Sequence, residues 1–215
     1  MSSFSTKESD TTQSEETIKE EKEALLVLAE DMVVNTKEVS FKSSLFGDAL
    51  REEYKIYEKY LPSYSDIKAR YLSSVAEVVN ETIANDFPQY VLSIAEELAN
   101  NPTIYVEDGV LITDTLENVT RDYLSSLLFS ALEENSEKLS LAFGESKDAC
   151  DKIKTAYSNL ILIGEEVDIP RVKEIDYSRV VSIALDKYYS ILKEEEEKLR
   201  NNPVYANPSY KAFWS

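Results

Sequence analysis

Acidic side chains gather in three stretches of the sequence, and they are the residues best placed to do chemistry. Carboxylate oxygens are ligands that Mg²⁺ prefers, and helical enzymes acting on nucleotides or diphosphates hold the metal between facing helices. No stretch has a diagnostic spacing with basic residues beside it to take a substrate's phosphates, so a solvated surface is the simpler interpretation. We predict no catalytic and no metal-binding residue. The stretches are Glu15, Glu16, Glu20 and Glu21; Glu30 and Asp31; and Glu194 to Glu197.

Histidine is absent from the chain. This excludes Ser-His-Asp and Cys-His catalysis and di-iron sites built on Glu-x-x-His. The four glycines stand far apart, so no Gly-rich phosphate-binding loop exists. The single cysteine, Cys150, falls on the apolar side of a predicted helix, and the acidic Asp148 and Asp151 oppose a thiolate there. We therefore predict a buried structural thiol, no cofactor and no enzymatic activity.

The C-terminal residues supply a binding motif. The stretch Asn207-Pro-Ser-Tyr-Lys-Ala-Phe-Trp214 ends in two adjacent aromatic residues. It resembles the peptide by which many replication and repair proteins dock on the sliding clamp: a Gln, an aliphatic residue three positions on, and two terminal aromatics. Here Asn207 replaces the Gln, and Tyr210 replaces the aliphatic residue. The resemblance implies a sliding clamp as partner, bound by Tyr210, Phe213 and Trp214. In the alternative, the aromatic residues fold back onto the helices.

The chain of 215 residues carries 41 acidic and 23 basic residues, a formal net charge of −18. This charge repels nucleic-acid phosphates and anionic membranes, so we expect neither non-specific nucleic-acid binding nor membrane association. A larger protein or complex with a basic surface fits better. The start lacks a secretory signal and no apolar run approaches the ~20 residues of a membrane span, so we predict a cytoplasmic protein. Abundant Glu with little Gln, Cys or Met indicates a thermophilic source.

Helices must position these groups, because 4 Gly and 6 Pro leave few turn-makers for a chain of short strands. We predict a mainly α fold: a single-domain helical bundle of six to seven helices with a small inserted β-hairpin. The helical domain should occupy residues 17–200. A disordered polar tail should precede it over 1–16, and a tail with an aromatic end should follow it over 201–215.

Apolar spacing and end signals locate the predicted helices. The first begins at the capping box Thr17–Glu20, ends near Asn35, and places Leu25, Leu28 and Met32 on its inward face. Pro88 suits the first turn of another helix. The other helices are predicted at about 50–61, 65–85, 88–100, 114–144, 146–164 and 171–200.

Two short β-prone runs interrupt the helical pattern. Thr103–Val106 and Val110–Thr113 flank Glu107-Asp-Gly109, and Asp-Gly can supply the positive φ angles of a tight turn. These residues predict the hairpin, over about 103–113.

The stretch RDYLSSLLFSALEE has two echoes in the chain, ARYLSSVAEVVNE and IDYSRVVSIALDK. When Tyr71, Tyr123 and Tyr177 are aligned, the residues four and eight positions on are apolar in each copy. The surrounding turns differ, so we interpret the echoes as one way of presenting a core face rather than as a repeat array. Tyr123, Leu127 and Ala131 should face inward.

Together these features predict a non-enzymatic acidic helical accessory or scaffold subunit that binds a larger protein assembly in nucleic-acid metabolism. Two alternatives stay open. One is a carboxylate-based, Mg²⁺-dependent helical enzyme, and the other is a self-assembling structural protein, viral or cellular.

Overall fold

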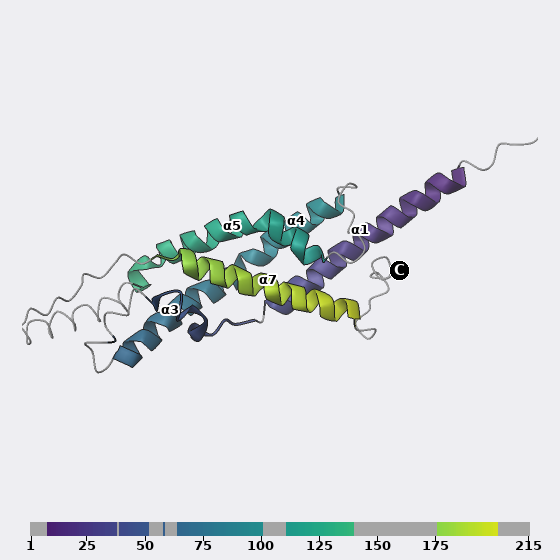
Figure 1. Cartoon of the computed structure of the whole chain (residues 1–215). Coiled ribbons are helices and arrows are strands. Elements are labelled where there is room, and N and C mark those ends of the chain that lie inside the picture. The colour runs from purple at the N-terminus through teal and green to yellow at the C-terminus, as the bar shows by residue number, and fades with distance from the viewer. Residues whose placement is uncertain are drawn as a thin grey trace, which may run out of the picture. The chain divides into compact units, whose positions relative to one another are not determined.

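The computed structural model describes residues 8–37, 39–51, 58, 64–100, 111–139 and 176–201, and most of them are helical (Figure 1). The predicted mainly α class is confirmed. Within this part of the chain, no helix is both long and apolar enough to cross a membrane. The elements are α1 (Glu8–Thr36), the 3-10 helix η1 (Ser43–Phe46), α3 (Tyr64–Asn85), α4 (Phe87–Asn100), α5 (Ile112–Glu134) and α7 (Ser178–Asn201).

The described residues thus contain five α-helices, fewer than the six or seven predicted. The predicted helices over 65–85 and 88–100 are confirmed as α3 and α4. The predicted helix over 146–164, with Cys150, lies outside the described residues, and so does most of the one predicted over 50–61.

The predicted hairpin over 103–113 is not supported. Residues 103–110 lie outside the described residues, whereas Ile112 and Thr113, assigned to the second strand, form the first turn of α5. Their backbone N–H groups donate to a carboxylate of α7. Because that carboxylate satisfies the donors that a strand would have paired, the β-prone side chains are accommodated in a helix.

Helix α1 begins at Glu8, nine residues before the predicted start at Thr17. A capping box marks a place where a helix can begin, but each residue added to an existing helix gains a hydrogen bond and so extends it at little cost. The rest of the predicted N-terminal tail, residues 1–7, lies outside the described residues.

Local signals explain two further helix starts. Pro88 lies in the first turn of α4, where its missing N–H costs no helical hydrogen bond. Helix α7 begins at Ser178 rather than near residue 171. At this start the Asp176 carboxylate accepts hydrogen bonds from the Ser178 backbone N–H (2.9 Å) and from the Ser178 hydroxyl (2.5 Å). These bonds hold the pKa of Asp176 below its usual value.

The chain forms two compact units. Unit 1 comprises Met1–Val39, Ala84–Asp122 and Lys187–Ser215, and unit 2 comprises Ser40–Ile83 and Tyr123–Asp186. Helices α5 and α7 are continuous and contribute residues to both units.

Unit 1 packs α1, α4, the start of α5 and the end of α7 around one core. Helix α1 lies against α4. An edge-to-face contact between Phe87 and Tyr188, with ring centroids 5.1 Å apart, joins α4 to α7. Leu25, Leu28 and Met32 are buried, which confirms the predicted inward face of the first helix. The other large apolar residues of this core include Val33, Val91, Leu98, Ile112, Leu116, Tyr189, Leu192 and Leu199.

Unit 2 packs α3, the later turns of α5 and the start of α7 with the segment that follows α1. Asn80 of α3 holds that segment: its Oδ1 accepts from the Phe41 backbone N–H (2.7 Å) and its Nδ2 donates to the Phe41 carbonyl (3.1 Å). Phe129 and Tyr177 join α5 to the residue before α7, with ring centroids 6.5 Å apart. Large buried residues of this core include Phe46, Leu50, Tyr71, Val75, Val79, Ile83, Leu139, Val181 and Leu185.

Helix α5 buries a different face from the predicted one. Tyr123 is 49% exposed, and Leu127 and Ala131 are only half-buried, so the prediction that they face inward is wrong. The buried stripe lies one residue further along, and the corresponding tyrosines of the two echoes, Tyr71 and Tyr177, are buried. Both stripes of α5 recur every four residues and both are rich in apolar side chains, so packing decides between them. The buried stripe is Leu116, Thr120, Leu124, Leu128 and Leu132.

Candidate functional site

A row of polar side chains lines the contact between the first turns of α5 and the second half of α7, both in unit 1. The ribbons of these two helices lie side by side in Figure 1. On α7 its members recur at steps of three or four residues, so they share one face of that helix. We call this row the polar seam. Its members are Thr113, Asp114, Thr120 and Arg121 of α5 and Tyr189, Lys193, Glu196 and Arg200 of α7.

Glu196 is the centre of the polar seam, and its side chain is fully buried. Its Oε1 accepts hydrogen bonds from the Ile112 backbone N–H (2.8 Å) and from Arg200 Nη2 (2.6 Å). Its Oε2 accepts from the Thr113 backbone N–H (2.8 Å) and hydroxyl (2.7 Å). The carboxylate therefore caps the start of α5 from another helix, and its negative charge faces the positive end of the α5 dipole.

These four donors occupy the acceptor sites that two carboxylate oxygens offer. Burial of a charge is costly unless the charge is paired and hydrogen-bonded, and Glu196 meets both conditions. A carboxylate engaged in this way has no lone pair left to bind a cation or to take a proton from a substrate. The arrangement fits a role in holding α5 to α7.

Tyr189 and Thr120 form a buried hydroxyl pair one helical turn along the seam from Lys193. The Thr120 hydroxyl donates to the Leu116 carbonyl (2.6 Å) and lies 2.6 Å from the Tyr189 hydroxyl. Because Thr120 has one hydroxyl hydrogen, Tyr189 donates in the second bond. Burial raises the pKa of Tyr189 to about 12, against a lowering effect of Thr120. Tyr189 is therefore protonated at neutral pH and acts as a hydrogen-bond donor, not as a base.

Charged groups extend the seam toward solvent. Lys193 donates to Asp114 (3.1 Å), and this hydrogen bond raises the pKa of Lys193. The Arg121 guanidinium lies 5.9 Å from the centroid of the Tyr189 ring, and it pairs with Glu117. Both arrangements are partly exposed, so each contributes little beyond orientation.

Glu195 connects α7 to a third helix, α1. Asn35 at the end of α1 donates through Nδ2 to Glu195 Oε2 (3.3 Å), and Lys198 contacts the other oxygen of the same carboxylate (2.5 Å). The acidic run Glu194–Glu197 therefore includes two residues that bind neighbouring helices, whereas Glu194 and Glu197 are exposed. The interpretation of the whole run as a solvated face is wrong for Glu196.

A sequence signal for the burial of Glu196 was present. Leu192 and Leu199 lie four residues before and three residues after it, so the apolar stripe of α7 passes through position 196. Among the four glutamates, this one has an Arg four residues on, at position 200. The identity of its partners on α5 had no signal in the sequence, because they are two backbone N–H groups and one hydroxyl of a distant segment.

The predicted partner-binding residues Tyr210, Phe213 and Trp214 lie outside the described residues, so the structure does not bring them to any site. Of the other acidic stretches, Glu20 and Glu30 are exposed and Asp31 is half-buried, all on α1. The side chains of Glu15, Glu16 and Glu21 are among those not described. In the part of the chain whose side chains are described, no three acidic or cysteine side chains are grouped so that they could hold a metal ion.

The chain has no match among the known proteins with which it was compared. No protein-family model, no curated protein and no solved structure matches the chain.

Proposed function

We propose that the chain is a non-enzymatic helical accessory subunit that binds the basic surface of a larger protein assembly. The observation that carries this proposal is the excess of acid: 41 acidic against 23 basic residues, a net charge of −18. A charge of this size speeds the encounter with a positively charged partner and disfavours phosphate-rich and anionic competitors.

Exposed acidic side chains lie on several described helices of unit 1. They include Glu20, Glu23 and Glu30 on α1, Glu96 and Glu97 on α4, and Glu194 and Glu197 on α7. Ion pairs between exposed side chains are weak. The negative charge of these exposed carboxylates can therefore still attract a basic partner. This distribution supports binding through a surface rather than through a single buried pocket.

The proposed assembly is one that handles nucleic acid. Proteins that contact phosphate backbones carry clustered Lys and Arg, and such basic surfaces are complementary to an acidic subunit. The aromatic tail, with Tyr210, Phe213 and Trp214, is proposed as a second anchor, and a sliding clamp is the partner that its resemblance suggests.

Capture from the native host tests the proposal. The full chain should retain a discrete set of basic proteins at about 50 mM NaCl and lose them by about 500 mM, because salt screens an electrostatic contact. A variant that lacks residues 204–215 separates the two anchors: reduced capture supports the tail, and unchanged capture removes the tail from the proposal. Capture that salt does not weaken, or no capture at all, contradicts the role of charge.

The alternative activities give different outcomes in solution. A carboxylate-based enzyme that binds Mg²⁺ or Mn²⁺ must be stabilised by the metal, because a ligand that binds only the folded state raises its melting temperature. We expect no such shift at millimolar metal. A self-assembling structural protein should grow with concentration in light scattering, whereas we expect the same particle size at two concentrations.

A further inference from the structure

The outward side of α1 carries acidic and aliphatic residues in a regular order. Glu20, Glu23, Val27, Glu30 and Val34 follow at steps of three and four residues, which places them along one side of the helix. The three glutamates and Val34 are exposed, and Val27 is half-buried. We call these five residues the acidic stripe of α1.

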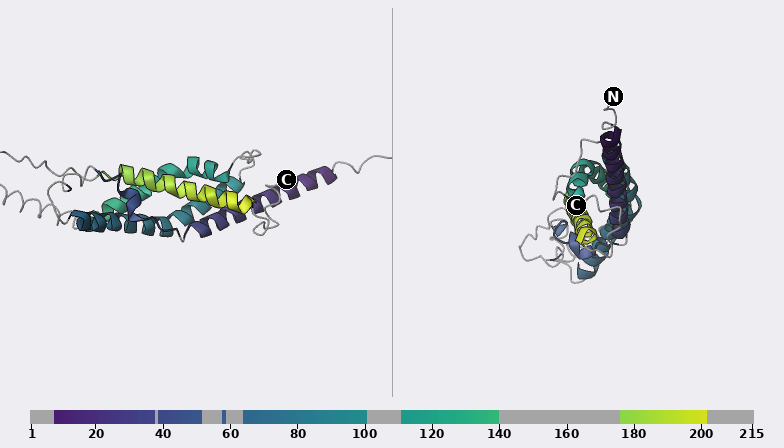
Figure 2. Two further views of the ribbon diagram at one scale, coloured as in Figure 1. Left: turned by 60° about the horizontal axis from the view of Figure 1, so that its bottom comes forward. Right: turned by 90° about the vertical axis from the view of Figure 1, so that its right-hand side faces the viewer.

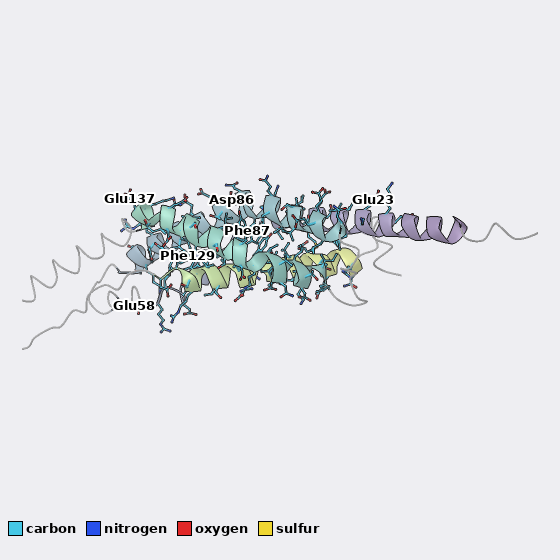
Figure 3. All side chains as sticks on the ribbon, turned by 90° about the horizontal axis from the view of Figure 1, so that it is seen from above. Glu23, Glu58, Asp86, Phe87, Phe129 and Glu137 are labelled. Atoms are coloured by element: carbon cyan, nitrogen blue, oxygen red, sulfur yellow. The ribbon has the colours of Figure 1, made fainter. Side chains whose placement is uncertain are left out.

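The other side of α1 is occupied by its own unit. Leu28, Ala29 and Met32 are buried where α1 packs on α4. Figure 3 shows the labelled Glu23 side chain pointing away from the neighbouring helices. Val34 is 58% exposed, the most exposed of the large apolar residues in the described part of the chain. The acidic stripe therefore faces solvent along the same turns whose opposite side forms the core.

The first half of α1 extends beyond its neighbours. Figure 1 and Figure 2 show it running past α4 and past the ends of α5 and α7 in unit 1, and Ala24 is the first buried residue among its described side chains. Residues 8–23 contain seven acidic and two basic residues, with Ile18 as the one apolar residue. Their Ser and Thr residues are poor helix formers, so intrinsic propensity does little to stabilise this half in isolation.

Charge and spacing select the occupant of this surface. A second copy would place acid against acid, and a nucleic acid or an anionic membrane would place phosphate against acid, so all three are repelled. A helix that lies alongside another meets it every three to four residues, which is the spacing of the stripe. Aliphatic side chains of such a helix would cover Val27 and Val34, and its Lys or Arg residues would face the glutamates.

We propose that the acidic stripe of α1 is a docking surface for a basic amphipathic helix of a partner protein. This inference rests on the proposed function, of which it names the surface and the class of partner.

Fluorescence anisotropy with two synthetic peptides tests the proposal. One peptide has Leu at alternating steps of three and four residues and Lys elsewhere, and the other has the same composition in scrambled order. The full chain should bind the amphipathic peptide more tightly than the scrambled one, because only the first can present aliphatic and basic residues together to the stripe.

Matched variants locate the binding surface. Neutralising the stripe with Glu20→Gln, Glu23→Gln and Glu30→Gln should raise the Kd about tenfold, since three exposed charge pairs together amount to about one such factor. The control Asp86→Asn, Glu96→Gln and Glu97→Gln changes the net charge equally at exposed positions elsewhere in unit 1, and it should raise the Kd about twofold or less.

The apolar contacts have their own control pair. Val34→Ser should weaken binding of the amphipathic peptide several-fold, whereas Val119→Ser, at a residue of α5 that is 49% exposed, should leave it unchanged. Equal losses of peptide affinity in the two charge variants would show that only the net charge matters. Equal affinity for the two peptides would exclude binding of an amphipathic helix aligned with the stripe. Either result overturns the stripe but not the proposed function. Failure of the full chain to bind either basic peptide overturns both.

Discussion

Glu196 shows how one buried side chain can connect two distant parts of a chain. Its carboxylate accepts from two backbone N–H groups at the start of α5, from the Thr113 hydroxyl and from Arg200. The first turn of a helix leaves N–H groups without intrahelical partners, and here they are satisfied by a residue more than eighty positions along the chain. The start of α5 is therefore fixed by tertiary structure.

Removing this charge should destabilise the fold. In Glu196→Gln an amide NH₂ replaces an acceptor oxygen beside backbone donors, and Arg200 loses its charged partner. We expect the free energy of unfolding to fall by about 3 kcal/mol, the order found when one member of a buried ion pair is removed. Urea unfolding followed by circular dichroism measures the change. The control Glu197→Gln alters the exposed neighbour and should cost less than about 0.5 kcal/mol, so equal losses would contradict the burial of Glu196.

Tyr189 should make the protein sensitive to alkaline pH. Its folded pKa is raised to about 12, whereas an unfolded tyrosine ionises near pH 10. Its contribution to stability is full below about pH 10 and is lost as pH rises toward 12, because only the unfolded state then gains by ionisation. In Tyr189→Phe the free energy of unfolding should fall less between about pH 9 and 11 in urea titrations. Equal pH dependence in both proteins would show that Tyr189 is not the responsible group.

Tyr188 provides the background for that comparison. Burial raises its pKa as well, with a smaller raising contribution from Tyr189 and an opposing one from Thr36, and the Tyr188 side chain itself is still present in the Phe variant. Tyr189→Phe should itself cost about 1 kcal/mol at neutral pH, the usual net value of a hydrogen bond such as the one to Thr120.

At the level of elements, the apolar spacing of α5 predicts a helix but does not predict which face of that helix is buried. Tyr123 and Leu127 belong to a stripe with four-residue spacing, and so do Leu124 and Leu128. Only the second stripe is buried. Neighbouring stripes on one helix differ by a rotation of about 100°, so both predict the same helix while packing selects one of them.

Truncating one leucine on each stripe to alanine should show which stripe contributes more to stability. Leu128→Ala removes a fully buried side chain and should lower the free energy of unfolding by about 3 kcal/mol, within the usual range for such cavities. Leu127→Ala, at a half-buried position on the next residue of the same helix, should cost about 1 kcal/mol. The two variants have the same composition, which makes each the control for the other. A larger loss from Leu127→Ala in denaturant titrations would restore the face predicted from the sequence.

For the whole molecule, charge is the dominant property. The net charge of −18 repels itself in the folded state, and the described ion pairs are mostly exposed and worth little. Raising NaCl from about 10 mM to about 300 mM should therefore increase the melting temperature, since screening weakens repulsion more than it weakens these pairs. Calorimetry at the two concentrations measures the change. A lower melting temperature at high salt would show that ion pairs dominate.

Several features of the fold were predictable because their causes are local. Few Gly and Pro residues favour helices, Pro88 suits the first turn of α4, and the apolar spacing of Leu25, Leu28 and Met32 marks the inward face of α1. The start of α1 was misplaced because helix propagation costs less than the capping signal at Thr17 suggests.

The candidate site was less predictable than the fold. The apolar stripe of α7 contained a signal for the burial of Glu196, but its partners Ile112 and Thr113 had the pattern of a strand. By itself the sequence determined the helical class, the acidic charge and the absence of histidine chemistry, since these depend on composition and local spacing. Only the tertiary structure decided where α5 begins, which of its stripes is buried and which glutamate joins it to α7. These choices depend on hydrogen bonds and contacts between segments far apart in the chain, whose energies no local pattern contains.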